Sequence, residues 1–231
     1  MKFTDLVPGT LIRRHKRFLA DVQMADGEQI TTHCPNTGSM RGCLSPGNPV
    51  LLSTSINRNR KYPFTLEMIG VNGGWVGINT ARTNQLVREA LENGVIGELA
   101  GCDTIRPEVK CGASRLDFLL RRGRETIYVE VKNCTLVEDG TAMFPDAVTA
   151  RGTRHLEELV RLHRAGHGAA IVFCVQRNDG HIFSPAAHID PLYAATLVRA
   201  TQEGVLVLAY RAAVAPDEIR ITTPLPIHEP L

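Results

Sequence analysis

Apolar and polar residues alternate in short runs through the first 80 residues, and glycine or proline separates the runs. Such alternation predicts β-strands, because successive side chains of a strand point to opposite faces of a sheet. We expect strands at 17–24, 28–34, 50–55, 64–71 and 75–78, with an Ala-Asp-Gly hairpin turn at 25–27. Five or six short strands in a segment of this size favour a small closed barrel of the OB type.

The pattern changes near residue 80. Apolar residues at 86, 87, 90 and 91 have a helical period, so we expect a helix over 80–93. Strands at 104–111, 114–121 and 126–135 follow, and their tight turns predict an antiparallel meander. Helices at 148–165 and 191–203 then alternate with apolar strands at 169–176 and 205–210, and the tail at 223–231 is expected to be extended and loosely held. We predict two domains, an all-β OB-like barrel over 1–80 and a mixed-sheet α/β domain over 81–231.

Composition places the chain among ordinary globular proteins, with 43% hydrophobic and 22% charged residues. The first ten residues lack the apolar run of a signal peptide. The longest nearly unbroken apolar stretch, 169–175, is far shorter than the roughly 20 residues of a membrane span. We therefore expect a cytoplasmic protein without membrane contact. None of the six cysteines forms a CxxC pair, which argues against a zinc ribbon and favours small buried side chains.

Positive charge is concentrated at the start of the chain. Residues 1–82 hold ten lysines and arginines against five acidic residues, whereas residues 83–231 hold sixteen against nineteen. This asymmetry suggests that the barrel faces a polyanion while the second domain holds an acidic site. The predicted DNA-binding residues are Arg13, Arg14, Lys16 and Arg17, then Arg58, Arg60 and Lys61, and finally Arg151 at the start of a helix. A solvated surface remains the alternative for each cluster taken alone.

Three charged residues in neighbouring predicted strands indicate chemistry. Glu130 and Lys132 are two positions apart and therefore project from one face of their strand. Asp117 interrupts an apolar strand, and a pairing through the Arg-Gly-Arg turn would place it close to opposite Glu130. Two adjacent carboxylates repel each other, and a divalent cation such as Mg²⁺ or Mn²⁺ relieves that repulsion. A half-buried ion pair between Lys132 and one carboxylate is the purely structural alternative.

The spacing D-(x12)-E-V-K resembles the PD-(D/E)XK nuclease superfamily, with Leu116 in place of the proline of its name. The resemblance implies that Asp117 and Glu130 hold the metal and that Lys132 assists the attacking water. It also implies a further acidic residue on the helix before the meander, for which Glu89 is the first choice and Glu92 the second.

Longer strings narrow the resemblance. They are CPNTGSMRG (34–42), SRLDFLL (114–120), YVEVKNCTL (128–136), MFPDAVTARGTRHLEEL (143–159) and VFCVQRND (172–179). Together they resemble the sugar fermentation stimulation protein A family of bacteria and archaea. That resemblance implies an OB-like barrel, a nuclease-like C-terminal domain and DNA binding, and the family's name refers to the use of sugars, especially maltose.

Three functions are compatible with these features. The leading hypothesis is a Mg²⁺- or Mn²⁺-dependent deoxyribonuclease, in which Asp117 and Glu130 bind metal, Glu89 adds a carboxylate and Lys132 assists the nucleophile. The second is a DNA-binding regulator of sugar catabolism that does not cut, and the third is a hydrolase of RNA or small phosphoesters. No base-reading motif is present, so the expected partner is DNA without strong sequence specificity. The sequence is also compatible with a homo-oligomer.

Overall fold

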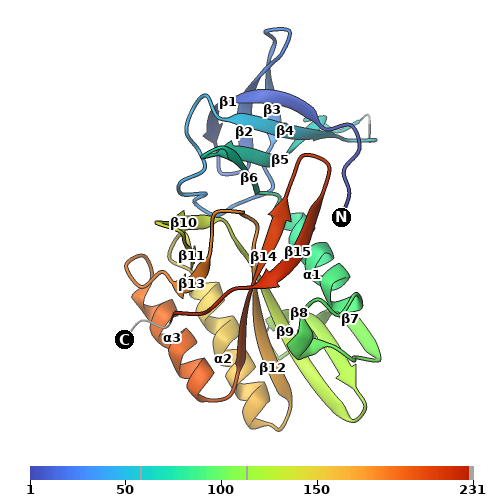
Figure 1. Cartoon of the computed structure of the whole chain (residues 1–231), viewed down its shortest axis with the longest axis vertical. Coiled ribbons are helices and arrows are strands. Elements are labelled where there is room, and N and C mark those ends of the chain that lie inside the picture. Colours follow the sequence, from blue (N-terminus) through green and yellow to red (C-terminus); the bar gives the residue numbers. More distant parts are fainter. Residues whose placement is uncertain (58, 113, 229–231) are drawn as a thin grey trace.

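A β-barrel stands at one end of the molecule, on top of a larger α/β unit (Figure 1). The computed structural model describes residues 1–57, 59–112 and 114–228. Arg58, one of the predicted DNA-binding residues, lies outside the described residues. No helix within the described ranges is long and apolar enough to cross a membrane.

The barrel is closed, as predicted. Its strands are β1 (Val7–His15), β2 (Leu19–Met24), β3 (Gln29–His33), β4 (Pro49–Thr54), β5 (Phe64–Val71) and β6 (Gly74–Gly77). They pair in the order β3-β2-β1-β4-β5-β6, and a parallel contact between β3 and β5 closes the ring. The ring thus contains β1 to β5, and β6 pairs with β5 beside it. Apolar side chains such as Leu11, Val22 and Leu66 fill the interior.

The first strand was not predicted from the sequence. Most of β1 is partly buried or exposed, with Leu11 the one residue of the strand that is fully buried, and a bulge after Leu11 shifts its pairing with β2. These features remove the clean alternation by which strands are recognised. The strand predicted to begin at residue 17 instead begins at Leu19, because Lys16 and Arg17 form the turn, with φ of 49° and 63°.

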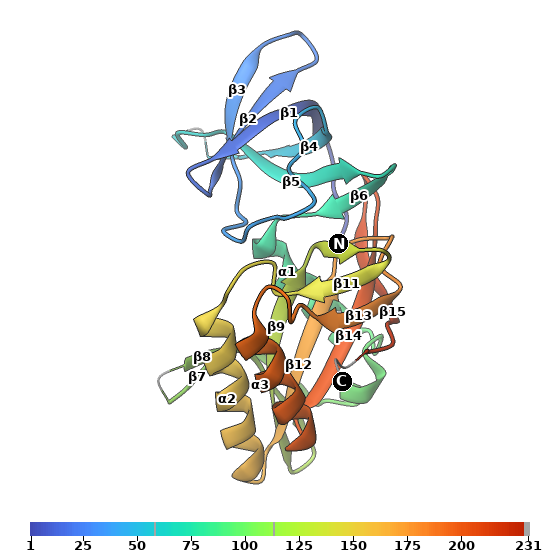
Figure 2. The ribbon, with the colours of Figure 1, turned by 90° about the vertical axis from the view of Figure 1, so that its left-hand side faces the viewer.

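The second unit is built on a mixed sheet, as predicted, but the sheet has six strands, because β15 (Ile219–Pro224) was not predicted from the sequence. Its strands are β7 (Thr104–Cys111), β8 (Ser114–Arg122), β9 (Glu125–Cys134), β12 (Gly168–Val175), β14 (Leu206–Val214) and β15 (Ile219–Pro224), and its helices are α1 (Thr83–Glu92), α2 (Ala150–Arg164) and α3 (Pro191–Gln202). Strands β7, β8 and β9 form the antiparallel meander, and β12 runs parallel to both β9 and β14. Figure 2 shows α2 and α3 side by side, and α1 packs into a separate apolar cluster.

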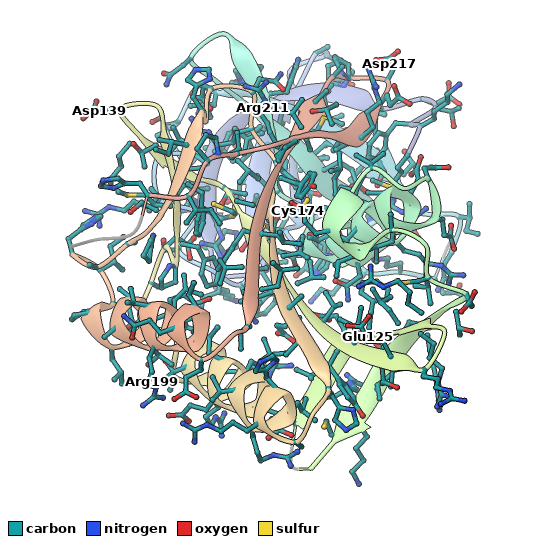
Figure 3. The ribbon with its side chains drawn as sticks, turned by 60° about the horizontal axis from the view of Figure 1, so that its bottom comes forward. Glu125, Asp139, Cys174, Arg199, Arg211 and Asp217 are labelled. Carbon is teal, nitrogen blue, oxygen red and sulfur yellow. The ribbon has the colours of Figure 1, made fainter. Side chains whose placement is uncertain are left out.

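Strand β12 forms the centre of this unit. Figure 3 shows Cys174 on β12 inside the molecule, while Arg199 of α3 lies at the outside. All six cysteines are free thiols and five of them are buried, in keeping with a packing role.

Several short elements were missed by the sequence analysis. Strands β10 (Leu136–Glu138), β11 (Thr141–Phe144) and β13 (Ile182–Pro185) form a small sheet, and single 3₁₀ turns lie at Thr80–Arg82 and Gly97–Leu99. The prediction of a loosely held tail is wrong for its described part. Leu225 is buried, and the amide of Phe183 donates to the carbonyl of Pro226 at 2.8 Å.

Candidate metal centre

Two carboxylates meet where β8 and β9 diverge. The pairing of the two strands ends at Phe118 and Val129, and Asp117 and Glu130 are the next residues of β8 and β9. Both acids line a cavity of about 530 Å³, and Lys132 lines the same cavity. The fold thus brings together the three residues that the sequence singles out.

Asp117 is held by one contact to each of its carboxylate oxygens. Oδ1 accepts a hydrogen bond from Nδ2 of Asn84 at 2.8 Å, and Oδ2 accepts one from the backbone amide of Val131 at 2.8 Å. Asn84 is the second residue of α1, so the start of this helix lies against the middle of β8. Each carboxylate oxygen has two lone pairs, and one hydrogen bond leaves each oxygen able to accept a second partner.

Glu130 is almost completely buried, with 2% of its surface exposed. Its Oε1 accepts a hydrogen bond from Nζ of Lys132 at 2.5 Å and is also hydrogen-bonded to Nδ1 of His155, which lies on α2. Its Oε2 is buried and has no hydrogen-bond partner among the described residues. A buried carboxylate oxygen without a partner carries a large desolvation cost, which a cation would offset.

The surroundings drive the pKa values of the two acids in opposite directions. Burial raises the pKa of Asp117 above its ordinary value, and the charge of Glu130 adds to that rise. Burial also acts to raise the pKa of Glu130, but the hydrogen bond from His155 and the charge of Lys132 outweigh it, so this pKa lies below its ordinary value. Coupled acids with opposed shifts are typical of functional sites.

The barrel contributes one wall of the cavity through its turn at residues 36–38 and through Arg17. This turn is bound to the loop before α2. The amide of Met40 donates to Oδ2 of Asp146 at 2.8 Å, and the hydroxyl of Ser39 donates to the carbonyl of Asp146 at 2.6 Å. At Gly38 a Cβ atom would lie 3.0 Å from both carboxylate oxygens of Asp146, so a side chain there would crowd this contact.

Arg14 organises the same turn from the barrel side. Its Nη2 donates to the carbonyls of Arg17, Asn36 and Gly38 at 2.5, 2.8 and 2.9 Å. These contacts give Arg14 an observed structural role, and its role in binding DNA stays a prediction. The turn lines the cavity that contains the acids.

The other predicted DNA-binding residues differ in their availability. Nε of Arg13 donates to Asp21 at 2.8 Å, and Nη1 of Arg60 donates to the hydroxyl of Thr65 at 3.0 Å. The ammonium group of Lys61 lies 5.4 Å from the centre of the Tyr62 ring. Lys16, Arg17 and Arg151 are exposed, and the last two line the cavity.

Glu89 is not part of the cavity, so its predicted role as a third carboxylate is wrong. Its Oε2 accepts a hydrogen bond from the amino group of Met1 at 2.8 Å. Asn84 of the same helix reaches Asp117, and five residues correspond to roughly 140° around a helix, which turns Glu89 away. Glu92, the second choice, is paired with Arg88 instead.

Sequence reasoning gave no role to three residues that shape the site, Asn84, His155 and Asp146. Two of them had weak signals: Asn84 is in the first turn of the helix that precedes the meander, and His155 follows Arg151 by one helical turn. Asp146 carried no signal, because its partners come from the barrel, 106 residues earlier in the chain.

The donors fit a hard divalent cation. Among residues 1–57, 59–112 and 114–228, no group of three or more His, Cys, Asp or Glu side chains is placed to hold a metal ion. Two carboxylates are nevertheless sufficient for Mg²⁺ or Mn²⁺, which often completes its shell with water and substrate phosphate. The unpartnered Oε2 of Glu130 and the remaining acceptor capacity of Asp117 are the atoms that meet this need.

Two family models match consecutive parts of the chain. A family model described as "SfsA N-terminal OB domain" matches residues 12–78, and one described as "Sugar fermentation stimulation protein RE domain" matches residues 81–218. A sugar fermentation stimulation protein homolog of Pelobacter propionicus is 55% identical over 98% of this chain and 99% of that protein. The homolog of Geobacter sulfurreducens is 54% identical over 96% of each chain.

A solved structure is similar over the whole length. The structure of Pyrococcus furiosus SfsA in complex with Ca²⁺ has a TM-score of 0.90 and 29% sequence identity, and the match covers 99% of this chain and 98% of that one. The barrel and the mixed-sheet unit therefore share one arrangement in both proteins.

Proposed function

The chain belongs to the sugar fermentation stimulation protein family, and we propose that it binds DNA and hydrolyses its phosphodiester bonds at a divalent-metal site. The observation that carries the proposal is the pair of carboxylates Asp117 and Glu130 beside Lys132 in one cavity. The Ca²⁺ complex of the Pyrococcus furiosus relative supports a site for a divalent cation.

Asp117 and Glu130 would hold the cation, Mg²⁺ or Mn²⁺. When bound, such an ion polarises a phosphate oxygen and acidifies water. Lys132 places a positive charge beside the two acids, where it can orient the attacking water and stabilise the extra negative charge of the transition state. The side chain of Lys132 is 14% exposed, so its charge is screened little by solvent.

Positive side chains on both sides of the cavity suit a phosphate backbone. Arg17 belongs to the barrel and Arg151 to α2, and both line the cavity. Lys16 is exposed beside Arg17 on the same turn. Because phosphate contacts carry no base information, we expect binding with little sequence specificity.

The decisive experiment is a cleavage assay on single-stranded, linear duplex and supercoiled DNA with Mg²⁺, Mn²⁺ or EDTA. We expect metal-dependent cutting by the wild type and a loss of about 100-fold or more in Asp117→Asn and Lys132→Met. Asp139→Asn is the matched control, because this aspartate is exposed on the β10–β11 turn, away from the site (Figure 3). Cutting that survives in both site variants would mean that another nuclease is present and would refute the proposal.

DNA binding is tested separately by salt titration. We expect Lys16→Glu and Arg17→Glu to weaken binding and to reduce the slope of log K against log salt by about 1 for each lost phosphate contact. Arg199→Glu provides the control, because this exposed arginine lies on the outer side of α3.

The family's name favours a second function, a regulator of sugar catabolism that binds DNA without cutting it. Wild-type protein that binds DNA tightly but leaves every substrate intact with either metal would establish this alternative over the nuclease.

A further inference from the structure

We infer that His155 is a positioning residue, whose imidazole fixes the carboxylate of Glu130 so that Oε2 is left free for a cation. The inference rests on the proposed metal site and identifies a residue that acts on it through Glu130. His155 is 5% exposed on α2 and is bonded through Nδ1 to Oε1 of Glu130.

The hydrogen bonds of Glu130 are divided unevenly between its two oxygens. Oε1 is bound by both His155 and Lys132, whereas Oε2 has no hydrogen-bond partner in the described part of the chain. Rotation of the carboxylate out of its plane would weaken the bonds to Oε1 and move the free oxygen, and the buried imidazole opposes that rotation. A glutamate held by Lys132 alone would depend on a flexible chain with several rotamers.

Arg151 determines which nitrogen of His155 carries the proton. Nε of Arg151 lies 3.4 Å from Nε2 of His155, and a guanidinium group can only donate. Nε2 must therefore accept, so the hydrogen is on Nδ1 and is donated to Glu130. The hydrogen bond from Nδ1 thus orients the carboxylate of Glu130 from the α2 side.

Arg151 also connects this arrangement to the cavity. Its side chain is exposed and lines the cavity. Within the described ranges, the guanidinium makes one hydrogen bond, to His155. The terminal nitrogens of its guanidinium therefore remain for a phosphate. Residues that orient metal ligands in this way typically change metal affinity by about 10- to 100-fold when they are removed.

The test measures Mn²⁺ binding to the full chain, by calorimetry and by electron paramagnetic resonance, in His155→Asn, His155→Gln and His155→Leu. The amide nitrogen of asparagine can take the place of Nδ1, whereas that of glutamine reaches the place of Nε2. We expect the leucine and glutamine variants to bind Mn²⁺ about 10- to 100-fold more weakly than wild type. The asparagine variant should retain most of the affinity, and this rescue separates positioning from simple packing.

A nitrogen-15 NMR measurement of the imidazole provides the second readout. We expect the Nδ1–H tautomer in wild type and a mixture of tautomers in Arg151→Met. Mn²⁺ affinity within twofold of wild type in both His155→Leu and His155→Gln would overturn the inference, as would equal loss in the asparagine and glutamine variants. Should the leucine variant fail to fold, the comparison of the asparagine and glutamine variants decides.

The inference can fail separately from the proposed function. Mn²⁺ binding that is lost in Glu130→Gln but unaffected by the His155 variants would overturn the inference and leave the metal site intact. Mn²⁺ binding that does not depend on Glu130 would overturn both.

Discussion

Replacement of Asp117 by asparagine is expected to stabilise the metal-free protein while it abolishes metal binding. Ionised Asp117 is disfavoured in the metal-free fold, because burial and the charge of Glu130 raise its pKa above the ordinary value of 3.8. Asparagine has nearly the same shape. Its oxygen can accept from the amide of Val131, and a flip of the Asn84 amide restores the other hydrogen bond.

Proton linkage gives the sign of the change in stability. Above pH 3.8 the unfolded chain has released this proton while the folded chain still holds it, so stability falls as pH rises through the folded pKa. A tenfold change in an acid dissociation constant corresponds to about 1.4 kcal/mol. We therefore expect Asp117→Asn to be more stable than wild type at pH 7. Single substitutions change stability by about 0.5–3 kcal/mol, and in a chain of this size each 1 kcal/mol raises Tm by about 2–4 °C.

The assay is thermal unfolding of wild type and variant in EDTA at pH 4 and pH 7, and again with Mn²⁺. The gain should shrink as the pH falls from 7 to 4, because the raised pKa of Asp117 favours its protonated form at the lower pH, and Mn²⁺ should stabilise the wild type but not the variant. A variant less stable than wild type in EDTA at pH 7 would refute the reasoning, because it would mean that the ionised carboxylate contributes more through its hydrogen bonds than its burial costs.

Asp21 provides a control of opposite sign. Burial acts to raise its pKa, but hydrogen bonds from Arg13, Thr31 and His15 outweigh this and lower the pKa to about 2. A lowered pKa stabilises the fold above pH 3.8, and this contribution is lost as pH falls toward about 2. Asp21→Asn should therefore lose roughly 2 kcal/mol at pH 7 in the same unfolding experiment.

Three further predictions concern the other parts of the site. Lys132→Met should slow cleavage about 100- to 1000-fold while Mn²⁺ affinity changes little, and a parallel loss of Mn²⁺ binding in calorimetry would contradict a role in the chemical step. Gly38→Ala should lower both Tm and cleavage, because the new Cβ would lie 3.0 Å from the Asp146 carboxylate; unchanged values in both assays would show that the turn can move aside. Glu89→Gln should leave Mn²⁺ binding unchanged and cost less than about 1 kcal/mol, since its pair with the amino terminus is 45% exposed on the glutamate side; a clear loss of metal affinity would restore Glu89 to the site.

The sequence was sufficient to predict the positions of residues that depend only on strand periodicity and short turns. Glu130 and Lys132 share a face because a strand has a period of two, and a short turn fixes the register that brings Asp117 close to Glu130. The barrel, the meander and the apolar strand β12 were predicted for the same reason, since each is marked by a pattern within one short segment.

Only the tertiary structure decided which distant groups complete the site. Helix rotation excluded Glu89 and selected Asn84, and the packing of α2 placed His155 against Glu130, 25 residues earlier in the chain. The barrel turn meets Asp146 through contacts over more than 100 residues of sequence. Basic residues that look alike in the sequence also have different surroundings in the fold. The guanidinium of Arg14 donates to backbone carbonyls, whereas Arg17 lines the cavity. Periodicity and charge are properties of a segment, whereas hydrogen-bond partners depend on how segments pack, and no short window of sequence contains that information.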